Sequence, residues 1–443
     1  MRTELNQRRR WPQLLALTLW ACAAVCTHAQ ESALATARPT ALLGGTLHLG
    51  NGEVIANGSL LFDQGRIVAL GARIQLPANA EQIDLVGAHV YPGLILLDST
   101  LGLIEVEAVR ATLDNTEFGE LNPNVRSADA YNVDSELLPV TRFNGVLSAQ
   151  IAPTGGLISG RSSVMKLDAW TAEEALLRAD DGVWLNWPQR LVTQIDENTL
   201  EAALTENPEY ARQMGELEDL FAQASTYRRA APSPRNLKLE ALGPLFEGTA
   251  RLYVRTDYAA DFDAAMAFAE RHQISAMAWV GAAEAEQLAA RLVESNIPVV
   301  ISAVHRLPIY PDSPFDQAYQ LAAHLHQAGV TVALTHSYYM NARNLAFQAG
   351  SARTYGVPAE QALAMITSVP AQLLGLADEL GTLKVGARAT LFVSEGDVLE
   401  MRGNRLTRAY IDGMAVNLQG RQQRLYQRYR ERYQRGDQVP ATD

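Results

Sequence analysis

Cysteine is almost absent from this sequence, with two residues in a chain of 443. Both of them, Cys22 and Cys26, lie within the first 29 residues, which have the features of a leader. A disulfide, a thiolate metal site and a cysteine nucleophile are therefore excluded from the rest of the chain. Stability must come from a packed core, for which a hydrophobic content of 48% is ample.

The apolar run at the start of the chain is too short for a comfortable membrane span. Residues 14–26 form an uncharged run of 13 residues, whereas a transmembrane helix needs about 20. The run follows arginines at 8–10 and precedes small residues at 27–29, which is the arrangement of a secretory signal peptide. We predict a signal peptide over residues 1–29 and a periplasmic protein that is not integral to a membrane; an uncleaved anchor is the alternative.

The chain has fewer basic than acidic side chains. The chain has 37 basic and 49 acidic side chains, and the predicted leader holds four of the arginines and one of the glutamates. The exported chain would carry 33 basic and 48 acidic side chains, a net charge of −15. Nucleic acid is not expected as a partner, because a polyanion would be repelled.

Two common catalytic motifs are missing. The first predicted barrel strand, residues 94–98, is not followed by a glycine-rich nucleotide turn, and the chain has no Gly-x-Ser-x-Gly elbow. Strands and helices nevertheless alternate between residues 93 and 379, which favours a barrel over a doubly wound sheet. Predicted strands are 94–98, 145–152, 251–256, 276–280, 297–302 and 330–335; predicted helices are 171–178, 197–204, 208–229, 259–272, 283–295, 315–328, 341–354 and 358–366.

Short β patterns flank this region on both sides. They cover residues 39–92 and 380–418, and turn pairs such as Gln64-Gly65 punctuate the first of them. The fold class is therefore predicted as α/β: a (β/α)₈ TIM barrel with a small discontinuous β-sandwich domain built from both chain ends. Residues 104–144, which lack periodicity, are expected to form a long excursion over the barrel mouth.

The chain end, residues 419–443, is predicted to be a helix rich in arginine and tyrosine. Leu425, Tyr426, Tyr429 and Tyr433 recur at spacings of three and four. The expected arrangement packs these tyrosines and leaves the arginines in water; binding to a membrane surface or a partner is the alternative.

Several stretches, taken in order, resemble the amidohydrolase superfamily in its imidazolonepropionase-like branch. They are "NGSLLFDQGRIVALG" leading to "IDLVGAHVYPGLI", "ARNLAFQAGSARTYGVPAEQALAMITSVPAQLLGL", and "LGTLKVGARATLFV" followed by "YIDGMAV". The resemblance implies a TIM barrel with a β-sandwich, and hydrolysis of carbon–nitrogen bonds by a metal-activated water. It also implies histidine ligands on strands one, five and six and an aspartate on strand eight.

The positions that carry those ligands in the family hold other residues here. The strand-one pair falls on Asp98 and Thr100, strand five on Arg255, strand six near Val280 and strand eight on His336. A guanidinium cannot lose its proton and cannot bind a cation. We therefore predict no resident metal, where the family norm is a divalent ion such as zinc, and we expect Asp98 and Arg255 to pair.

Four residues are the candidate catalytic groups. His305 and His336 follow predicted strands and could act as metal-free acid and base together with Asp98 and Asp257. The same four residues could form a weak oxygen and nitrogen metal site, and each histidine could instead be structural.

The candidate ligand-binding groups are Arg255, Gly155, Gly156, Ser162 and Ser163. Arginine in a pocket binds carboxylates, and the last four belong to a predicted loop, residues 154–163, that could form an anion nest. A tight turn that merely needs glycine is the alternative.

Two functions follow from these residues. One is a hydrolase for a cyclic amide or peptide-like substrate. The other is a metal-free barrel that binds an anionic small molecule or partners an active relative in a homo- or hetero-oligomer.

Overall fold

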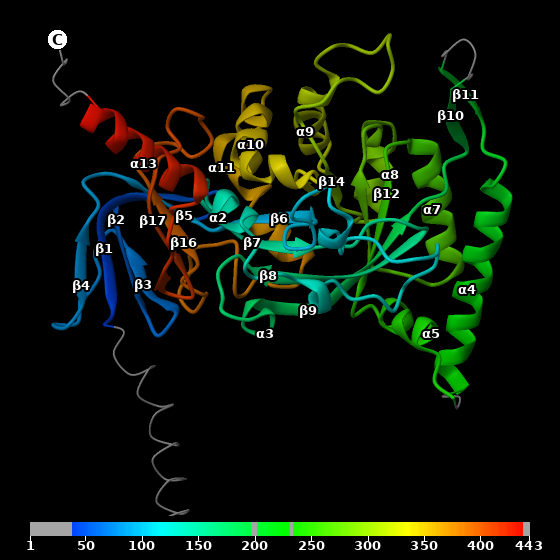
Figure 1. The fold of residues 1–443 in the computed structure, drawn as a ribbon, viewed down its shortest axis with the longest axis horizontal. Helices are drawn as coiled ribbons and strands as arrows, with labels where there is room; N and C mark the ends of the chain where they lie inside the picture. Colours follow the sequence, from blue (N-terminus) through cyan, green and yellow to red (C-terminus); the bar gives the residue numbers. More distant parts are fainter. Residues whose placement is uncertain (1–37, 196–201, 231–233, 437–443) are drawn as a thin grey trace, which may run out of the picture.

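The computed structural model describes residues 38–195, 202–230 and 234–436, which form two large sheets and one two-stranded sheet with flanking helices (Figure 1). The predicted signal peptide lies outside the described residues. Within the ranges given above, every helix falls short of the length and apolar character that a bilayer crossing requires.

Both ends of the chain contribute to the smaller sheet. Its strand order is β18-β17-β16-β5-β1-β2-β3, and β4 pairs with β1. β5 and β16 join the two halves in antiparallel register, from Pro92 opposite Leu391 to His89 opposite Ser394. A sandwich of two layers is not confirmed, since all these strands belong to one sheet. The strands are β1 (Thr40–His48), β2 (Val54–Asp63), β3 (Arg66–Gly71), β4 (Glu81–Asp84), β5 (His89–Pro92), β16 (Leu391–Ser394), β17 (Leu406–Ile411) and β18 (Met414–Ala415).

The larger sheet is a nearly closed barrel of eight strands in the order β15-β14-β13-β12-β9-β8-β7-β6. Its first and last strands are bridged by one segment, because Leu334 N donates to Met365 O and Ile95 N donates to Ile366 O. A hydrogen bond from Thr335 Oγ1 to Leu97 O also crosses this gap. The strands are β6 (Leu94–Ser99), β7 (Val146–Ile151), β8 (Ile158–Lys166), β9 (Leu176–Asn186), β12 (Arg251–Thr256), β13 (Met277–Gly281), β14 (Val299–Ile301) and β15 (Val332–Leu334).

One barrel strand runs against the others. β8 pairs antiparallel with both β7 and β9, whereas the remaining neighbours are parallel. The predicted loop over residues 154–163 is therefore wrong from residue 158 onward. The predicted helix over 171–178 is shortened to α3 (Ala172–Ala175), because β9 begins at Leu176 and pairs with β8. Tertiary pairing overrides the helix propensity of this segment.

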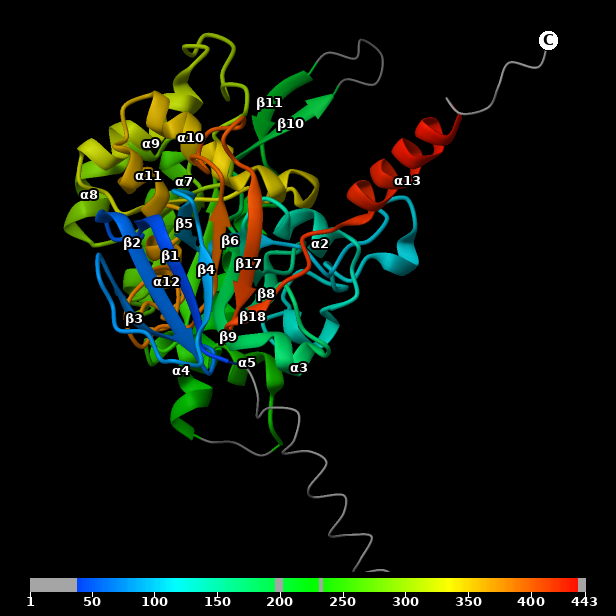
Figure 2. The same cartoon turned by 90° about the vertical axis from the view of Figure 1, so that its left-hand side faces the viewer.

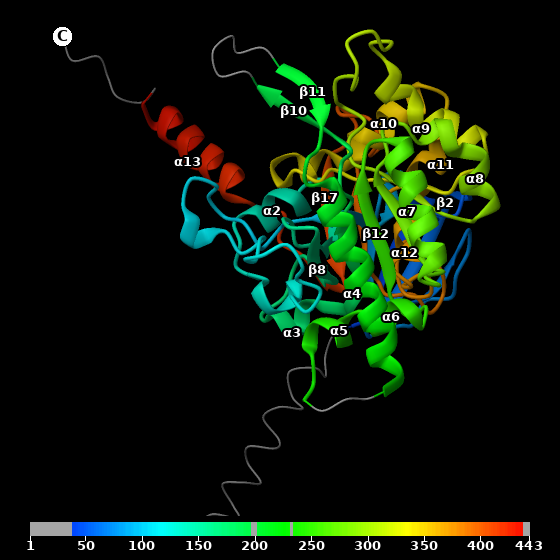
Figure 3. The ribbon, with the colours of Figure 1, turned by 90° about the vertical axis from the view of Figure 1, so that its right-hand side faces the viewer.

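Helices cover the outside of the barrel (Figure 3), and most of them match the predicted ranges. The helix predicted over 197–204 is wrong at its described end, since β11 (Ala202–Glu206) pairs with β10 (Leu191–Ile195) in a hairpin. The α-helices are α2 (Leu137–Arg142), α4 (Tyr210–Ala230), α5 (Leu237–Ala241), α6 (Gly243–Phe246), α7 (Ala259–Arg271), α8 (Ala289–Glu294), α9 (Gln317–Gln327), α10 (Leu345–Thr354), α11 (Ala359–Ala364), α12 (Ser368–Leu373) and α13 (Arg421–Gly436). The short 3₁₀ turns are η1 (Arg110–Thr112), η2 (Ser127–Ala130), η3 (Ala285–Leu288) and η4 (Tyr339–Asn344).

The long excursion, residues 104–144, lies along β8 for much of its length. Isolated bridges join Leu121 to Ile158 and Arg126 to Arg161. Close approach requires glycine in two places, because a Cβ at Gly156 would lie 2.8 Å from Glu120 O and Gly160 likewise faces backbone. The excursion therefore covers the barrel wall in the place where a (β/α)₈ barrel would have helices.

The C-terminal helix α13 projects from the body beside α2 (Figure 2). The predicted packing of its tyrosines is wrong, since Tyr426, Tyr429 and Tyr433 are each at least half exposed. Arg424 reaches Glu136 at 3.5 Å and ties the start of the helix to the barrel.

Candidate functional site at the barrel mouth

A cavity of about 700 Å³ opens at the carboxyl ends of the parallel barrel strands. We call it the mouth cavity. Parallel strands bring their carboxyl ends to one rim, so side chains far apart in sequence meet there. Its lining includes Asp98 near the end of β6, Asn186 at the end of β9, Arg255 in β12, Asp257 directly after β12, Arg306 after β14 and Ser337 after β15.

Asp98 and Arg255 form an ion pair at the centre of this rim, as the sequence predicted. Asp98 Oδ1 accepts from Arg255 Nη2 at 2.5 Å and from Nε at 3.1 Å. The aspartate side chain is 5% exposed and the arginine side chain 18%. The guanidinium carbon also lies 4.1 Å above the Trp184 ring, which adds a cation–π attraction.

Other partners occupy the rest of the Arg255 guanidinium. Nη1 donates to Pro153 O at 3.1 Å and to Asn186 Oδ1 at 3.4 Å. The Arg255 guanidinium thus makes four hydrogen bonds to oxygen atoms of the protein. The predicted role of Arg255 as a ligand receptor is not supported by this geometry, because the group is already satisfied.

A buried polar network lies behind the pair, and sequence reasoning missed it. Gln150 accepts from Asp98 N at 3.3 Å and donates to Asp181 Oδ2 at 2.6 Å. The Tyr253 hydroxyl donates to the same Asp181 oxygen at 3.2 Å. Burial raises the pKa of the Asp181 carboxyl, and its hydrogen bonds and Arg178 oppose that shift.

The residues at the expected metal position do not fit a divalent ion. Among the residues that the structure describes, three or more His, Cys, Asp or Glu side chains nowhere gather as a metal site would need. Asp98 is engaged by Arg255, and Thr100 and Val280 offer no charged ligand. An arginine at 4 Å would repel an ion by about 4 kcal/mol per unit charge at an effective dielectric of about 20.

The two candidate histidines are not among the residues that line the mouth cavity, whereas Asp98 and Asp257 are. The ring of His305 contacts α10, with Nε2 2.6 Å from Ser351 Oγ and Nδ1 3.1 Å from Gln348 Nε2. His336 is buried, and its Nδ1 has no hydrogen-bond partner in the described chain. Burial lowers the pKa of both imidazoles, and His305 lowers that of His336 further.

Asp257 does line the mouth cavity. Its Oδ1 accepts from Ala283 N at 3.2 Å, which fixes the turn after β13. The exposed side chain is therefore oriented by a backbone N–H.

The predicted anion nest is not found at the rim. Ser162 and Ser163 are fully buried in β8, where Ser162 Oγ accepts from Gln150 Nε2 and Ser163 Oγ accepts from Asp180 N. Gly155 and Gly156 have φ of 82° and 62° and pack against the excursion. They serve a close backbone crossing, which was the alternative interpretation.

Arg306 is a lining residue that the sequence analysis overlooked. It is half-buried, and its guanidinium has no partner among the side chains or carbonyls of the described residues. The signal was available, because Arg306 follows strand β14 by five residues and directly adjoins His305.

Comparison with known proteins agrees with this architecture. Residues 246–418 match the family model described as "Amidohydrolase family". An amidohydrolase from Thermotoga maritima has the same fold at a TM-score of 0.74 and 23% identity, covering 85% of this chain and 99% of the other. The ochratoxinase of A. niger superposes with a TM-score of 0.52 at 12% identity, covering 87% and 98%.

A sequence relative is Amidohydrolase tasK of Hapsidospora irregularis, which is 21% identical over 393 residues. The match covers 81% of this chain and 40% of that protein, so the chain spans well under half the length of the curated relative. The predicted resemblance to amidohydrolases is confirmed for residues 246–418 by the family model and for the fold by the solved structures. The imidazolonepropionase-like branch stays a prediction.

Proposed function

Because the chain carries an amidohydrolase family domain on a matching barrel, we propose that its mouth cavity binds a small anionic molecule without a metal ion. The observation that carries this proposal is the contrast between two arginines. Arg255 is neutralised by Asp98, whereas Arg306 lines the same cavity without a partner in the part of the chain that the structure describes. An unpaired guanidinium in a concave site is a receptor for carboxylate or phosphate.

We also propose that the protein is exported. The basic head, the short apolar run and the small residues Thr27 and Ala29 are typical of a leader. The protein would then meet its ligand in the periplasm.

Titration calorimetry with succinate, inorganic phosphate and neutral succinamide tests the proposal. Succinate or phosphate should bind and succinamide should not, and Arg306→Gln should weaken anion binding at least about ten-fold, since a charged hydrogen bond contributes about 1.5–3 kcal/mol. Arg402→Gln, which changes an exposed arginine in the turn between β16 and β17, is the matched control. Anion binding that Arg306→Gln leaves unchanged would refute the assignment.

The family domain itself favours a second candidate, hydrolysis of a carbon–nitrogen bond in a cyclic amide or a peptide-like substrate. Asp257 is the residue placed to act as a base, since it lines the cavity and is oriented by Ala283 N. Cleavage of dipeptides to free amino acids, or ring opening of hydantoin to N-carbamoylglycine, should then occur with the purified protein and should stop in Asp257→Asn. Absence of product from the unmodified protein with both substrate classes would remove this candidate.

A further inference from the structure

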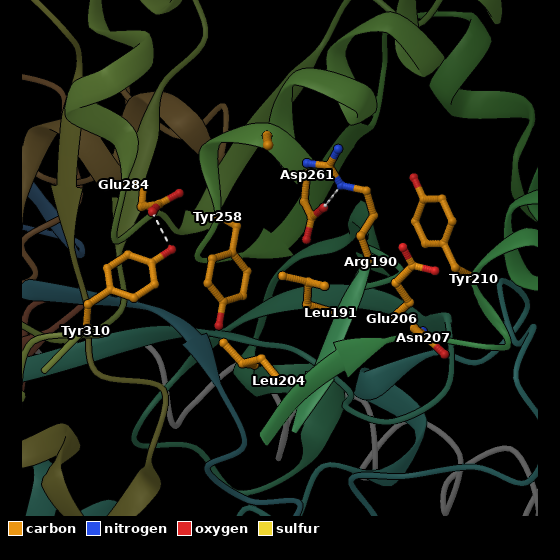
Figure 4. Close-up of a pocket in the computed structure, with 11 residues that line it drawn as sticks. Arg190, Leu191, Leu204, Glu206, Asn207, Tyr210, Tyr258, Asp261, Glu284 and Tyr310 are labelled. Carbon is orange, nitrogen blue, oxygen red and sulfur yellow. Dashed lines mark hydrogen bonds and ion pairs between the residues drawn. The ribbon is translucent and has the colours of Figure 1, made fainter. Parts of the chain in front are cut away.

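A second cavity has a volume of about 560 Å³, and its lining residues are drawn in Figure 4. It is bounded by the β10–β11 hairpin, the starts of α4 and α7, the turn after β13 and the loop after β14. We call it the tyrosine cleft. It shares one lining residue, Asn207, with the mouth cavity, so the two cavities adjoin.

The tyrosine cleft is walled by rings and exposed leucines. Tyr258 and Tyr310 lie next to each other, and Tyr210 stands on the far side of Arg190 (Figure 4). Leu191 and Leu204, on facing strands of the hairpin, are 50% and 59% exposed. A ligand with an aromatic or alkyl body would cover this apolar surface and gain roughly 25 cal/mol for each Å² buried.

The charges of the cleft are negative on balance. One arginine, Arg190, faces three carboxylates, and it is held by the buried Asp261 at 2.9 Å. Glu284 accepts from the Tyr310 hydroxyl and from Ala259 N, both at 2.8 Å, so it caps α7.

Glu206 is the one of the three carboxylates that takes no part in these contacts. It lies between Arg190 and Tyr210 in Figure 4, and its side chain has no hydrogen bond or ion pair within the described ranges. Its charge is therefore open to a ligand, in a cleft whose tyrosine faces also favour cations.

We infer that the tyrosine cleft binds an organic cation, an ammonium or guanidinium group carried on an aromatic or alkyl body. The cation would lie against Glu206 and the tyrosine rings, and the body would cover Leu191 and Leu204. A cation of this kind satisfies the net charge of the cleft without disturbing the Arg190–Asp261 pair or the cap of α7. The inference is independent of the anion site, because the two cavities select opposite charges.

Three probes with one body separate charge from hydrophobicity: phenethylamine, 2-phenylethanol and 3-phenylpropionate. Titration calorimetry of the purified protein should show phenethylamine binding most tightly. Glu206→Gln should weaken that binding about five- to ten-fold, while Glu400→Gln, which alters an exposed turn, should leave it unchanged. Glu206 is exposed and unpartnered in the described chain, so its replacement leaves the fold intact.

Tyr258→Leu provides a second test, since it keeps apolar volume and removes the ring. It should lower the affinity for phenethylamine by more than it lowers the affinity for 2-phenylethanol. Equal binding of all three probes, or phenethylamine binding that neither variant changes, would overturn the inference.

Discussion

At the scale of single residues, the buried Asp98–Arg255 ion pair contributes to the stability of the barrel mouth. Asp98 is 5% exposed, and one of its carboxylate oxygens accepts two hydrogen bonds from the Arg255 guanidinium. Replacement of Arg255 by Met would leave that carboxylate buried without its counterion. We expect a loss of about 3–5 kcal/mol in the free energy of unfolding.

Urea denaturation measures this loss, and a double variant isolates the pair. Asp98→Asn combined with Arg255→Met should be more stable than Arg255→Met alone, because the buried charge is gone. Arg402→Met is the control for loss of an exposed arginine. If Arg255→Met unfolds at the same urea concentration as the unmodified protein, the ion pair does not contribute to the free energy of unfolding.

Asp181 should make stability depend on pH. Burial raises the pKa of its carboxyl, so the folded protein keeps this proton to a higher pH than the unfolded chain does. Its contribution is fully present below the unfolded pKa of about 3.9 and is lost as the pH rises through the folded pKa. Asp181→Asn, which carries no charge, should therefore gain stability relative to the unmodified protein as the pH rises.

Thermal unfolding of both proteins between pH 4 and pH 8 would show this trend. The difference in melting temperature should move steadily in favour of Asp181→Asn. A difference that stays constant with pH would mean that Asp181 does not hold a proton in the folded state.

At the scale of elements, β8 and the excursion that covers it were the least predictable parts. The segment Ile158–Lys166 contains glycine and three polar residues in a row, Arg161, Ser162 and Ser163, so its strand character comes from pairing with β7 and β9. The excursion packs on it through glycines, and neither contact has a local sequence signal.

Gly156 offers a test of that packing. Gly156→Ala forces a side chain into the left-handed region, at φ 62°, and places its Cβ 2.8 Å from Glu120 O. Gly386→Ala meets a similar strain at φ 90° with open space around it. Gly156→Ala should destabilise the protein by about 1–3 kcal/mol and by more than the control. Equal losses of stability in the two variants would show that the excursion moves aside for the new Cβ at no measurable cost in free energy.

At the scale of the whole molecule, the hydrophobic periodicity and the order of strands and helices along the chain predicted much of the fold. The strands 94–98, 251–256 and 276–280 and the helix over 208–229 lie within a residue or two of the observed elements. The alternation of strands and helices favoured the barrel that the structure shows, and the β patterns at both ends meet in one sheet.

The candidate site was harder to predict from the sequence than the fold, for a physical reason. Strand ends indicate which residues approach the rim. The resemblance to amidohydrolases placed Asp98 and Arg255 at metal-ligand positions there, which is why the two could be paired in advance. Strand ends do not fix where a loop side chain points. His305 therefore proved to contact α10, and Arg306 beside it lines the cavity.

Metal content tests the central claim most directly. The purified protein should be incubated with Zn²⁺, passed through a desalting column and analysed by mass spectrometry of the elements, alongside Asp98→Asn. If Arg255 holds Asp98 as described, retained metal should be far below one ion per chain and equal in both proteins. One tightly held ion per chain that is lost in Asp98→Asn would contradict the account.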